Sequence, residues 1–147
     1  MPERPASTNG LRLARASDIA AMQRIRASVR ENRLVSMVIS DEDVRTAIED
    51  TGYGWVIEED GTVVAFAVGN VRTGNVWALF VHPDHEQRGH GRRLHDAMVT
   101  RLFECGLERL WLTTEPGTRA QRFYEAAGWR RTGTTKQGEL EYELRRT

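Results

Sequence analysis

A segment in the middle of the chain places the strongest constraint on the fold. Residues 76–81 form an unbroken apolar run, which predicts a central strand buried on both faces. His82-Pro83 ends this strand, because proline has no amide hydrogen to donate to a sheet ladder. An amphipathic helix is predicted over residues 91–105 and another strand over residues 109–114. Strand, helix and strand in this order predict a right-handed parallel crossover.

The long helix carries an apolar stripe that predicts its buried face. Gly106 follows the stripe and is suited to end the helix in the left-handed conformation. We expect Cys105 to pack in the core and not to act as a nucleophile, and we expect His95 on the helix surface. The stripe consists of Leu94, Ala97, Met98, Leu102 and Cys105.

The N-terminal part predicts one strand and two helices. Residues 11–16 alternate as a half-buried strand, and Ser17 is the expected N-cap of a helix whose apolar positions are Met22, Ile25 and Val29. A second helix is expected to begin at Ser40 with Asp43 as its capping-box partner. Val44, Ala47 and Ile48 would form its apolar face and Gly52 would end it. Residues 30–39 show no period and predict a loop.

The remaining elements are two hairpins and a short helix. Strands over 54–58 and 63–68 are joined by Asp60-Gly61, a strong hairpin signal. A helix over 118–127 has Thr118 and Gln121 as a capping box and Gly128 after its end. Its predicted buried face is Ala120, Phe123, Tyr124 and Ala127. Strands over 129–134 and 139–144 close the chain around Gln137-Gly138.

Composition excludes several classes of protein. The chain has 147 residues, 39% hydrophobic, with 21 basic and 21 acidic side chains and a net charge of zero. This length predicts one domain over 1–147, with residues 1–10 as a flexible tail. Zero net charge argues against a nucleic-acid partner, and no apolar run is long enough for a membrane span. The N-terminus lacks a secretory h-region, and the single cysteine fits a cytoplasmic protein.

The loop between the apolar strand and the long helix has the residues of an anion site. A helix start offers unpaired N–H groups and partial positive charge. Gly89 and Gly91 allow close approach of the backbone, and Arg88, Arg92 and Arg93 add forked donors. The alternative is a glycine-containing loop beside a solvated arginine face. Neither the phosphate loop with its lysine nor the dinucleotide fingerprint matches this spacing.

In context this loop resembles a motif of the GNAT acetyltransferase family. The family pattern [QR]-x-x-G-x-[GA] corresponds to residues 86–91, with both glycines present and Glu86 at the position where glutamine or arginine is usual. Residues 119–129 resemble the family's later helix-and-turn segment. Gly117 replaces an asparagine that is common there, which removes one presumed cofactor hydrogen bond.

The resemblance implies a mixed α/β fold. Its central, mostly antiparallel sheet would have six to seven strands, with one splayed parallel pair, flanked by about four helices. Acetyl-CoA would enter between the splayed strands as the acyl-CoA substrate and add to the sheet like a strand. Phe80 or Val81 would supply the backbone N–H that polarises the thioester carbonyl. The implied cofactor-binding residues are Leu79, Phe80, Val81, Gln87, Arg88, Gly89, His90, Gly91 and Arg92.

The implied reaction is direct attack of a primary amine on the thioester in a ternary complex. Tyr124 stands at the family's general-acid position, and a phenol is suited to protonate the departing thiolate. The general base stays open between Glu58, Glu115, His82 and a water chain. The histidine spacing does not predict a metal site.

The acceptor also stays open. It is a small-molecule or a protein amine, and its specificity is expected from Arg30, Glu31, Asn32, Arg33 and Trp77. The closing hairpin offers an edge for a possible homodimer, as is common among similar proteins. The alternative function is a non-catalytic acyl-CoA sensor or interaction module.

Overall fold

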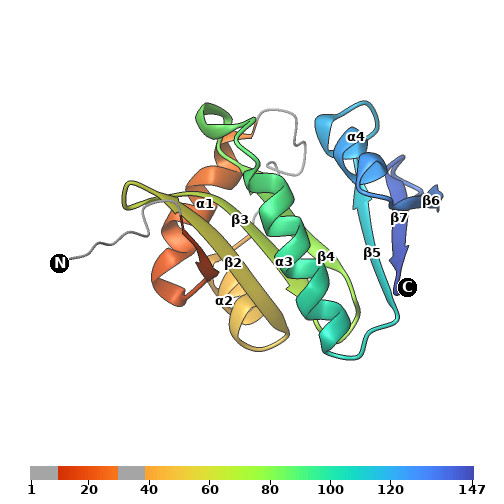
Figure 1. Cartoon of the computed structure of the whole chain (residues 1–147), viewed down its shortest axis with the longest axis horizontal. Helices are drawn as coiled ribbons and strands as arrows, with labels where there is room; N and C mark the ends of the chain where they lie inside the picture. Colours follow the sequence, from red (N-terminus) through yellow and green to blue (C-terminus); the bar gives the residue numbers. More distant parts are fainter. Residues whose placement is uncertain (1–9, 30–38) are drawn as a thin grey trace.

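The structure is a computed structural model that describes residues 10–29 and 39–147. It has a mixed α/β fold with two antiparallel sheets, ordered β1-β2-β3-β4 and β5-β7-β6 (Figure 1). The elements are β1 (Leu11–Leu13), a 3-10 turn η2 (Ala16–Asp18), α1 (Ile19–Ser28), α2 (Asp41–Glu49), β2 (Gly52–Glu59), β3 (Thr62–Asn70), β4 (Val76–Val81), a 3-10 turn η4 (Pro83–His85), α3 (His90–Glu104), β5 (Arg109–Thr114), α4 (Arg119–Ala126), β6 (Arg130–Thr134) and β7 (Leu140–Arg145).

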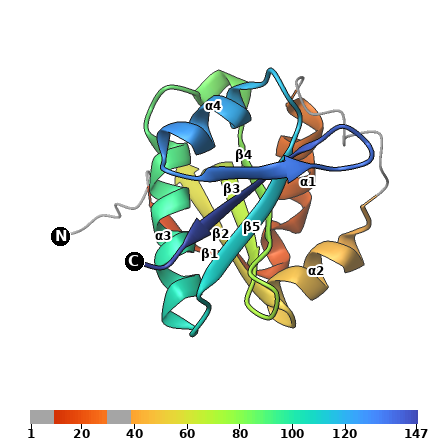
Figure 2. The ribbon, with the colours of Figure 1, turned by 90° about the vertical axis from the view of Figure 1, so that its right-hand side faces the viewer.

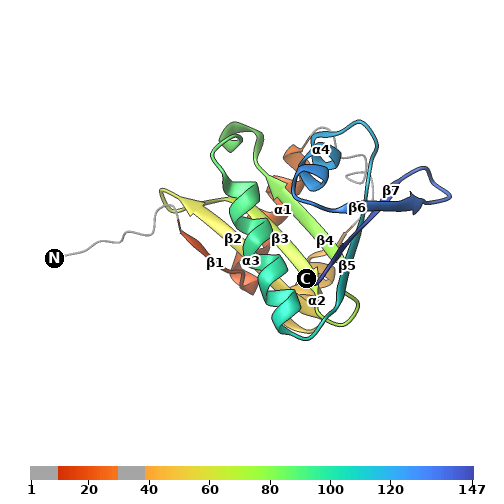
Figure 3. The ribbon, with the colours of Figure 1, turned by 45° about the vertical axis from the view of Figure 1, so that its right-hand side comes forward.

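Helices cover both faces of the first sheet, with α1 and α2 on one side and α3 on the other (Figure 3). Alternate residues of the central strands therefore reach two separate cores. Val56 and Phe66 pack with α1 and α2, whereas Ile57 and Ala65 pack with Leu94 of α3. Because both faces are covered, the middle of β2 and β3 is buried throughout.

The second sheet stands beside the first, with β5, β7 and β6 in the foreground of Figure 2. The two sheets meet at one parallel bridge between Asn75 and Trp111. There the Trp111 amide donates to the Gly74 carbonyl at 3.0 Å, and Asn75 Nδ2 donates to the Trp111 carbonyl at 3.3 Å. The parallel direction predicted for β4 and β5 is confirmed, but no ladder continues beyond this bridge, so the strands separate toward their C-terminal ends.

The prediction that residues 76–81 form a strand buried on both faces is wrong. The strand is present, but only Val76 is buried, and Trp77 is 38% exposed. The reason is that β4 is the last strand of its sheet. Its expected neighbour β5 belongs to the second sheet and is joined to the first sheet by a single bridge. Most of its side chains are therefore only partly buried.

Turn and capping predictions are confirmed where the conformation depends on residues only a few positions apart. Ser40 and Asp43 form the expected capping box of α2. Asp60 and Gly61 both have positive φ, 52° and 81°, as a two-residue hairpin turn requires. Gly128 follows α4 with φ 98°.

Four local predictions at element ends need correction. The first strand stops at Leu13, and a 3-10 turn with Asp18 precedes α1, so Ser17 is not its N-cap. Asp18 binds the Arg12 guanidinium and the Arg15 amide, which stabilises this turn. Gly52 opens β2, because α2 ends at Glu49. Cys105 is exposed at the C-cap of α3, because the stripe leaves the core in the last turn.

Candidate functional site

A cleft of about 680 Å³ occupies the space between the separated strands. Its walls are β4 and the start of α3 on one side, and the end of β5 and α4 on the other. Eight of the nine predicted cofactor residues line it; the Arg88 side chain does not. Lining residues that the prediction did not include are Val29, Val76, Ala78, Pro83, His85, Glu86, Leu112, Thr113, Thr114, Thr118, Arg119, Ala120, Arg122 and Phe123.

The free edge of β4 follows from its register with β3. The His82 amide donates to the Val64 carbonyl at 2.8 Å, so His82 belongs to a hydrogen-bonded pair. These pairs alternate along an antiparallel ladder, which places Phe80, opposite Phe66, in the same set. Leu79 and Val81 therefore direct their N–H and C=O groups away from β3 toward the cleft.

The expectation that Phe80 polarises a carbonyl with its N–H is wrong in this register, whereas Val81 keeps a free amide. The shift between the Val68–Ala78 and Gly69–Val76 pairs makes Trp77 the extra residue on β4. The irregularity thus lies upstream of the strand end. The register of β4 against β3 determines which amides are free, and the sequence of β4 alone does not specify this register.

The loop after β4 presents backbone groups to one end of the cleft. Gln87 and Gly89 both have left-handed φ, 64° and 84°, and α3 begins at His90. The first turn of a helix has N–H groups without intrahelical partners. A methyl group at Gly91 would lie 3.7 Å from Cε1 of Phe123 and 3.9 Å from side-chain atoms of Leu79 and Val81, so this glycine faces the cleft.

The cations predicted around the loop are paired within the protein. Arg88 Nη1 lies 2.6 Å from Glu59 Oε1, and Arg92 Nε lies 3.2 Å from Asp96 Oδ1. Glu86, at the position where the family usually has glutamine or arginine, forms an ion pair with Arg119 of α4. Both residues line the cleft, so this pair spans its two walls.

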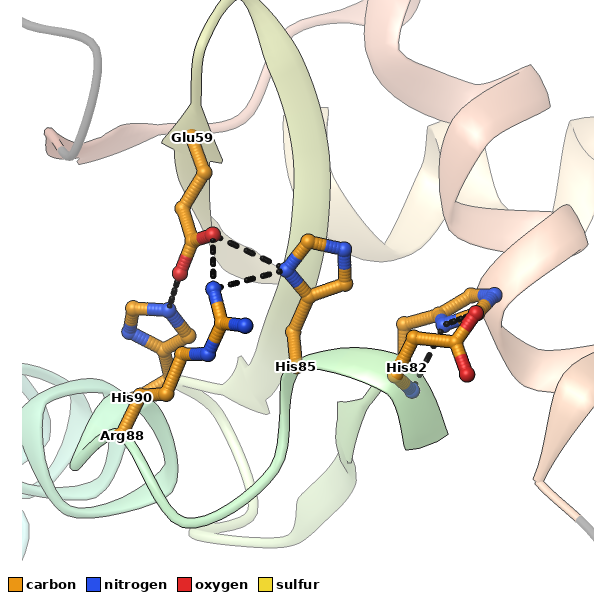
Figure 4. A network of polar contacts seen from close by, with 6 residues as sticks. Glu59, His82, His85, Arg88 and His90 are labelled. Atoms are coloured by element: carbon orange, nitrogen blue, oxygen red, sulfur yellow. Dashed lines mark hydrogen bonds and ion pairs between the residues drawn. The ribbon is translucent and has the colours of Figure 1, made fainter.

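Glu59, at the end of β2, is a residue that sequence reasoning missed. Its carboxylate contacts Nδ1 of His85 at 2.9 Å, the Arg88 guanidinium and Nε2 of His90 (Figure 4). Hydrogen bonding from His90, then from His85, and the charge of Arg88 lower the pKa of Glu59. The only sequence signal was an acidic residue beside a hairpin turn, which is ordinary on a surface.

Tyr124 lies in the wall of the cleft, on α4, and is 6% exposed. Its ring packs against Phe123 and Trp129, with centroids 5.3 and 5.4 Å away. Its hydroxyl has no hydrogen-bond partner among the described residues. Burial raises the pKa of Tyr124, so the phenol keeps its proton at neutral pH.

His95 is buried beside Tyr124, so its predicted place on the helix surface is wrong. It is 4% exposed, and its ring centroid is 6.5 Å from that of Tyr124. Nε2 accepts a hydrogen bond from Trp129 Nε1 at 2.9 Å, so Nδ1 carries the proton and donates to Asp96 at 2.9 Å. Burial lowers the pKa of His95. Trp129, which is distant in sequence, covers His95. A helical wheel considers only the residues of the helix itself and therefore cannot predict this burial.

Of the three side chains considered as general base, only Glu115 lines the cleft. Glu58 is bound to Arg12 at 3.2 Å, and His82 Nδ1 accepts from the Asp84 amide at 3.1 Å. Trp77 also lines the cleft. The other residues expected to govern specificity, Arg30, Glu31, Asn32 and Arg33, lie outside the described residues, as does most of the loop predicted over 30–39.

Within residues 10–29 and 39–147, no group of three or more His, Cys, Asp or Glu side chains is arranged to hold a metal ion. In the same part of the chain, no helix combines the length and apolar character needed to cross a membrane.

Comparison with known proteins identifies the family of the chain. The profile of the Acetyltransferase (GNAT) family matches residues 20–129, whereas a search of curated proteins finds no matching relative.

Solved structures with the same fold include three acetyltransferases. PaiA N-acetyltransferase from Thermoplasma acidophilum, in complex with coenzyme A, is 13% identical, covers 92% of this chain and 98% of its own, and has a TM-score of 0.78. YncA, a putative acetyltransferase from Salmonella typhimurium with acetyl-CoA, is 20% identical, with 94% of each chain covered and a TM-score of 0.77. Ribosomal-protein-alanine N-acetyltransferase from Brucella melitensis is 19% identical, with 92% and 99% covered and a TM-score of 0.77. The family profile spans most of the chain, and this chain belongs to the GNAT acetyltransferase family.

Proposed function

We propose that the protein transfers an acetyl group from acetyl-CoA to a primary amine by direct attack in a ternary complex. The observation that carries this proposal is the joint position of three features along one cleft. These are the free edge of β4, the glycine-containing helix start of α3 and the buried phenol of Tyr124.

The residues present fit the chemical parts of acetyl-CoA. Free backbone groups of Leu79 and Val81 suit the amides of the pantetheine arm, in the manner of an added strand. The N–H groups from Gln87 to Arg92 suit the pyrophosphate, because a helix start favours anions. Gly91 leaves room beside them, since a larger side chain there would fill the space.

The reaction forms a C–N bond and breaks the C–S bond of the thioester. We assign Tyr124 as the general acid that protonates the departing thiolate. A phenol with a raised pKa is a weak acid, but the same buried site also raises the pKa of a thiol, because desolvation disfavours its charged form. We assign the Val81 or Leu79 amide as the donor that polarises the thioester carbonyl. The amine proton goes to Glu115 or to water.

A second function, a non-catalytic acyl-CoA sensor, is favoured by two departures from the family pattern. The strand β4 contains no glutamate, and Gly117 replaces an asparagine. Tyr124 argues for catalysis, and turnover with an amine distinguishes the two functions.

The test is ligand binding followed by turnover. Thermal unfolding is measured with acetyl-CoA, CoA and ATP, and thiol release is then measured with small amines and with peptides bearing free N-termini or lysines. We expect stabilisation by both CoA compounds and not by ATP, and thiol release with at least one amine class. Stabilisation without turnover on any amine would favour the sensor, and no stabilisation by either CoA compound would refute both functions.

A further inference from the structure

One carboxylate contacts the loop after β4 at three places. Glu59 comes from the β2–β3 hairpin, about thirty residues earlier in the chain. Its partners His85, Arg88 and His90 stand before, within and after the stretch of left-handed backbone at Gln87 and Gly89. Figure 4 shows these side chains converging on Glu59, while His82 lies apart.

This cluster is shielded from solvent at its centre. The side chain of Glu59 is 11% exposed and that of His90 is 5% exposed. Nδ1 of His90 is buried and has no partner among the described residues, so Glu59 is the polar anchor of this ring. Hydrogen bonds with a charged partner are shorter and stronger than neutral ones, and shielding from water increases their effect.

The loop needs such an anchor because its backbone is unfavourable by itself. A left-handed φ at Gln87 is disfavoured for a residue with a side chain, and conformations of this kind persist when the surrounding contacts impose them. The contacts of Glu59 at both ends of this stretch are suited to impose it.

We propose that Glu59 is a positioning residue for acyl-CoA binding, holding residues 85–90 so that their amides face the pyrophosphate. The inference rests on the proposed function. It also assigns Arg88 a different role from a phosphate ligand, since its guanidinium is directed to Glu59 and its side chain does not line the cleft.

The negative charge of Glu59 also repels the pyrophosphate of acyl-CoA, which opposes the benefit of positioning the loop. Removal of the Glu59 charge leaves Arg88 unpaired, which would attract the pyrophosphate over a distance. About 1 M salt shortens the Debye length to about 3 Å and screens this long-range attraction. Loss of preorganisation depends on contacts and remains under these conditions.

The experiment measures the Kd of CoA by calorimetry at about 0.1 M and about 1 M salt. The variants are Glu59→Gln, Arg88→Met and the double variant. Glu104→Gln serves as the matched control, since Glu104 lies at the far end of α3 and is 61% exposed. At high salt we expect Glu59→Gln to raise Kd about tenfold, a loss of about 1.4 kcal/mol. We expect the control to stay within about twofold.

Steady-state kinetics and coupling distinguish positioning from general damage. The KM for acetyl-CoA should rise with Kd while kcat at saturation is retained. The double variant should bind as Glu59→Gln does, because the ion pair that Arg88→Met removes is already lost in Glu59→Gln. Multiplied effects in the double variant, or an unchanged Kd of Glu59→Gln at high salt, would overturn the proposal.

If wild type itself fails to bind CoA, the proposed function is refuted, whereas normal wild-type binding with an unaffected Glu59→Gln refutes only the positioning role. If Glu59→Gln does not fold, it is replaced by Glu59→Asp, which withdraws the carboxylate from all three partners by one methylene. Hydrogen exchange of residues 82–91 is then measured without ligand. Faster exchange than in wild type supports the proposal, and unchanged exchange overturns it.

Discussion

Gly91 offers a substitution series that separates folding from cofactor binding. It lies in the first turn of α3 and faces Phe123 across the cleft. Gly91→Ala adds one methyl group at ordinary contact distance, 3.7 Å from the nearest atom, while alanine stabilises a helix by about 0.5–1 kcal/mol relative to glycine. For a chain of this size that gain corresponds to a rise in Tm of about 2–4 °C.

Gly91→Leu places a larger side chain in the cleft between β4 and α4. The cleft is not part of the packed core, so we expect this variant to fold with a Tm no lower than that of wild type. Acyl-CoA binding should nevertheless fall by about a hundredfold or more, because the added atoms occupy the space beside the free edge of β4. Gly91→Ala is the matched control and should retain binding within about threefold.

The assay is thermal unfolding with and without CoA. A ligand at about 100 times its Kd stabilises the native state by about 2.7 kcal/mol, which corresponds to a rise in Tm of roughly 10 °C. Wild type and Gly91→Ala should show this rise, and Gly91→Leu should show almost none. Full stabilisation of Gly91→Leu by CoA would refute the assignment of this cleft as the cofactor site.

Three other predictions concern the acid, a buried histidine and an ion pair. Tyr124→Phe should lower kcat about a hundredfold with little change in the Kd of acetyl-CoA; an unchanged kcat in the thiol-release assay would exclude the acid role. Burial lowers the pKa of His95, so below about pH 6.5 His95 is protonated in the unfolded chain but stays neutral in the folded chain. The free energy of unfolding should therefore decrease as the pH is lowered below about 6.5. Denaturant titrations should show this slope in wild type and not in His95→Gln. Asp18→Asn breaks the two-fold contact with Arg12, at 2.8 and 2.9 Å, and should cost about 2 kcal/mol in urea unfolding; a loss below about 0.5 kcal/mol would show that solvent screens this pair.

Local features of the sequence were enough for most elements of the fold. Ser40 with Asp43 marks the start of α2, and Asp60-Gly61 marks the first hairpin, because capping and turns depend on residues a few positions apart. The glycine motif after β4 located the loop and the helix start for the same reason.

The candidate site was predictable only in part. Tyr124 and the residues of β4 were found through motif position, and they do line one cleft. Glu59 was not found, since its role depends on a hairpin reaching a loop about thirty residues away. His95 was misplaced because its covering partner, Trp129, comes from the segment after α4.

The sequence by itself determined the order of elements, the glycine loop at a helix start and the family resemblance, all of which depend on short-range patterns. Tertiary structure alone decided which edges and charges are free. The register of β4 against β3 leaves Leu79 and Val81, not Phe80, facing the cleft. The β2–β3 hairpin brings Glu59 to the loop after β4, where it forms an ion pair with Arg88. Strand pairing and ion pairing join residues far apart in the chain, and no local pattern specifies them.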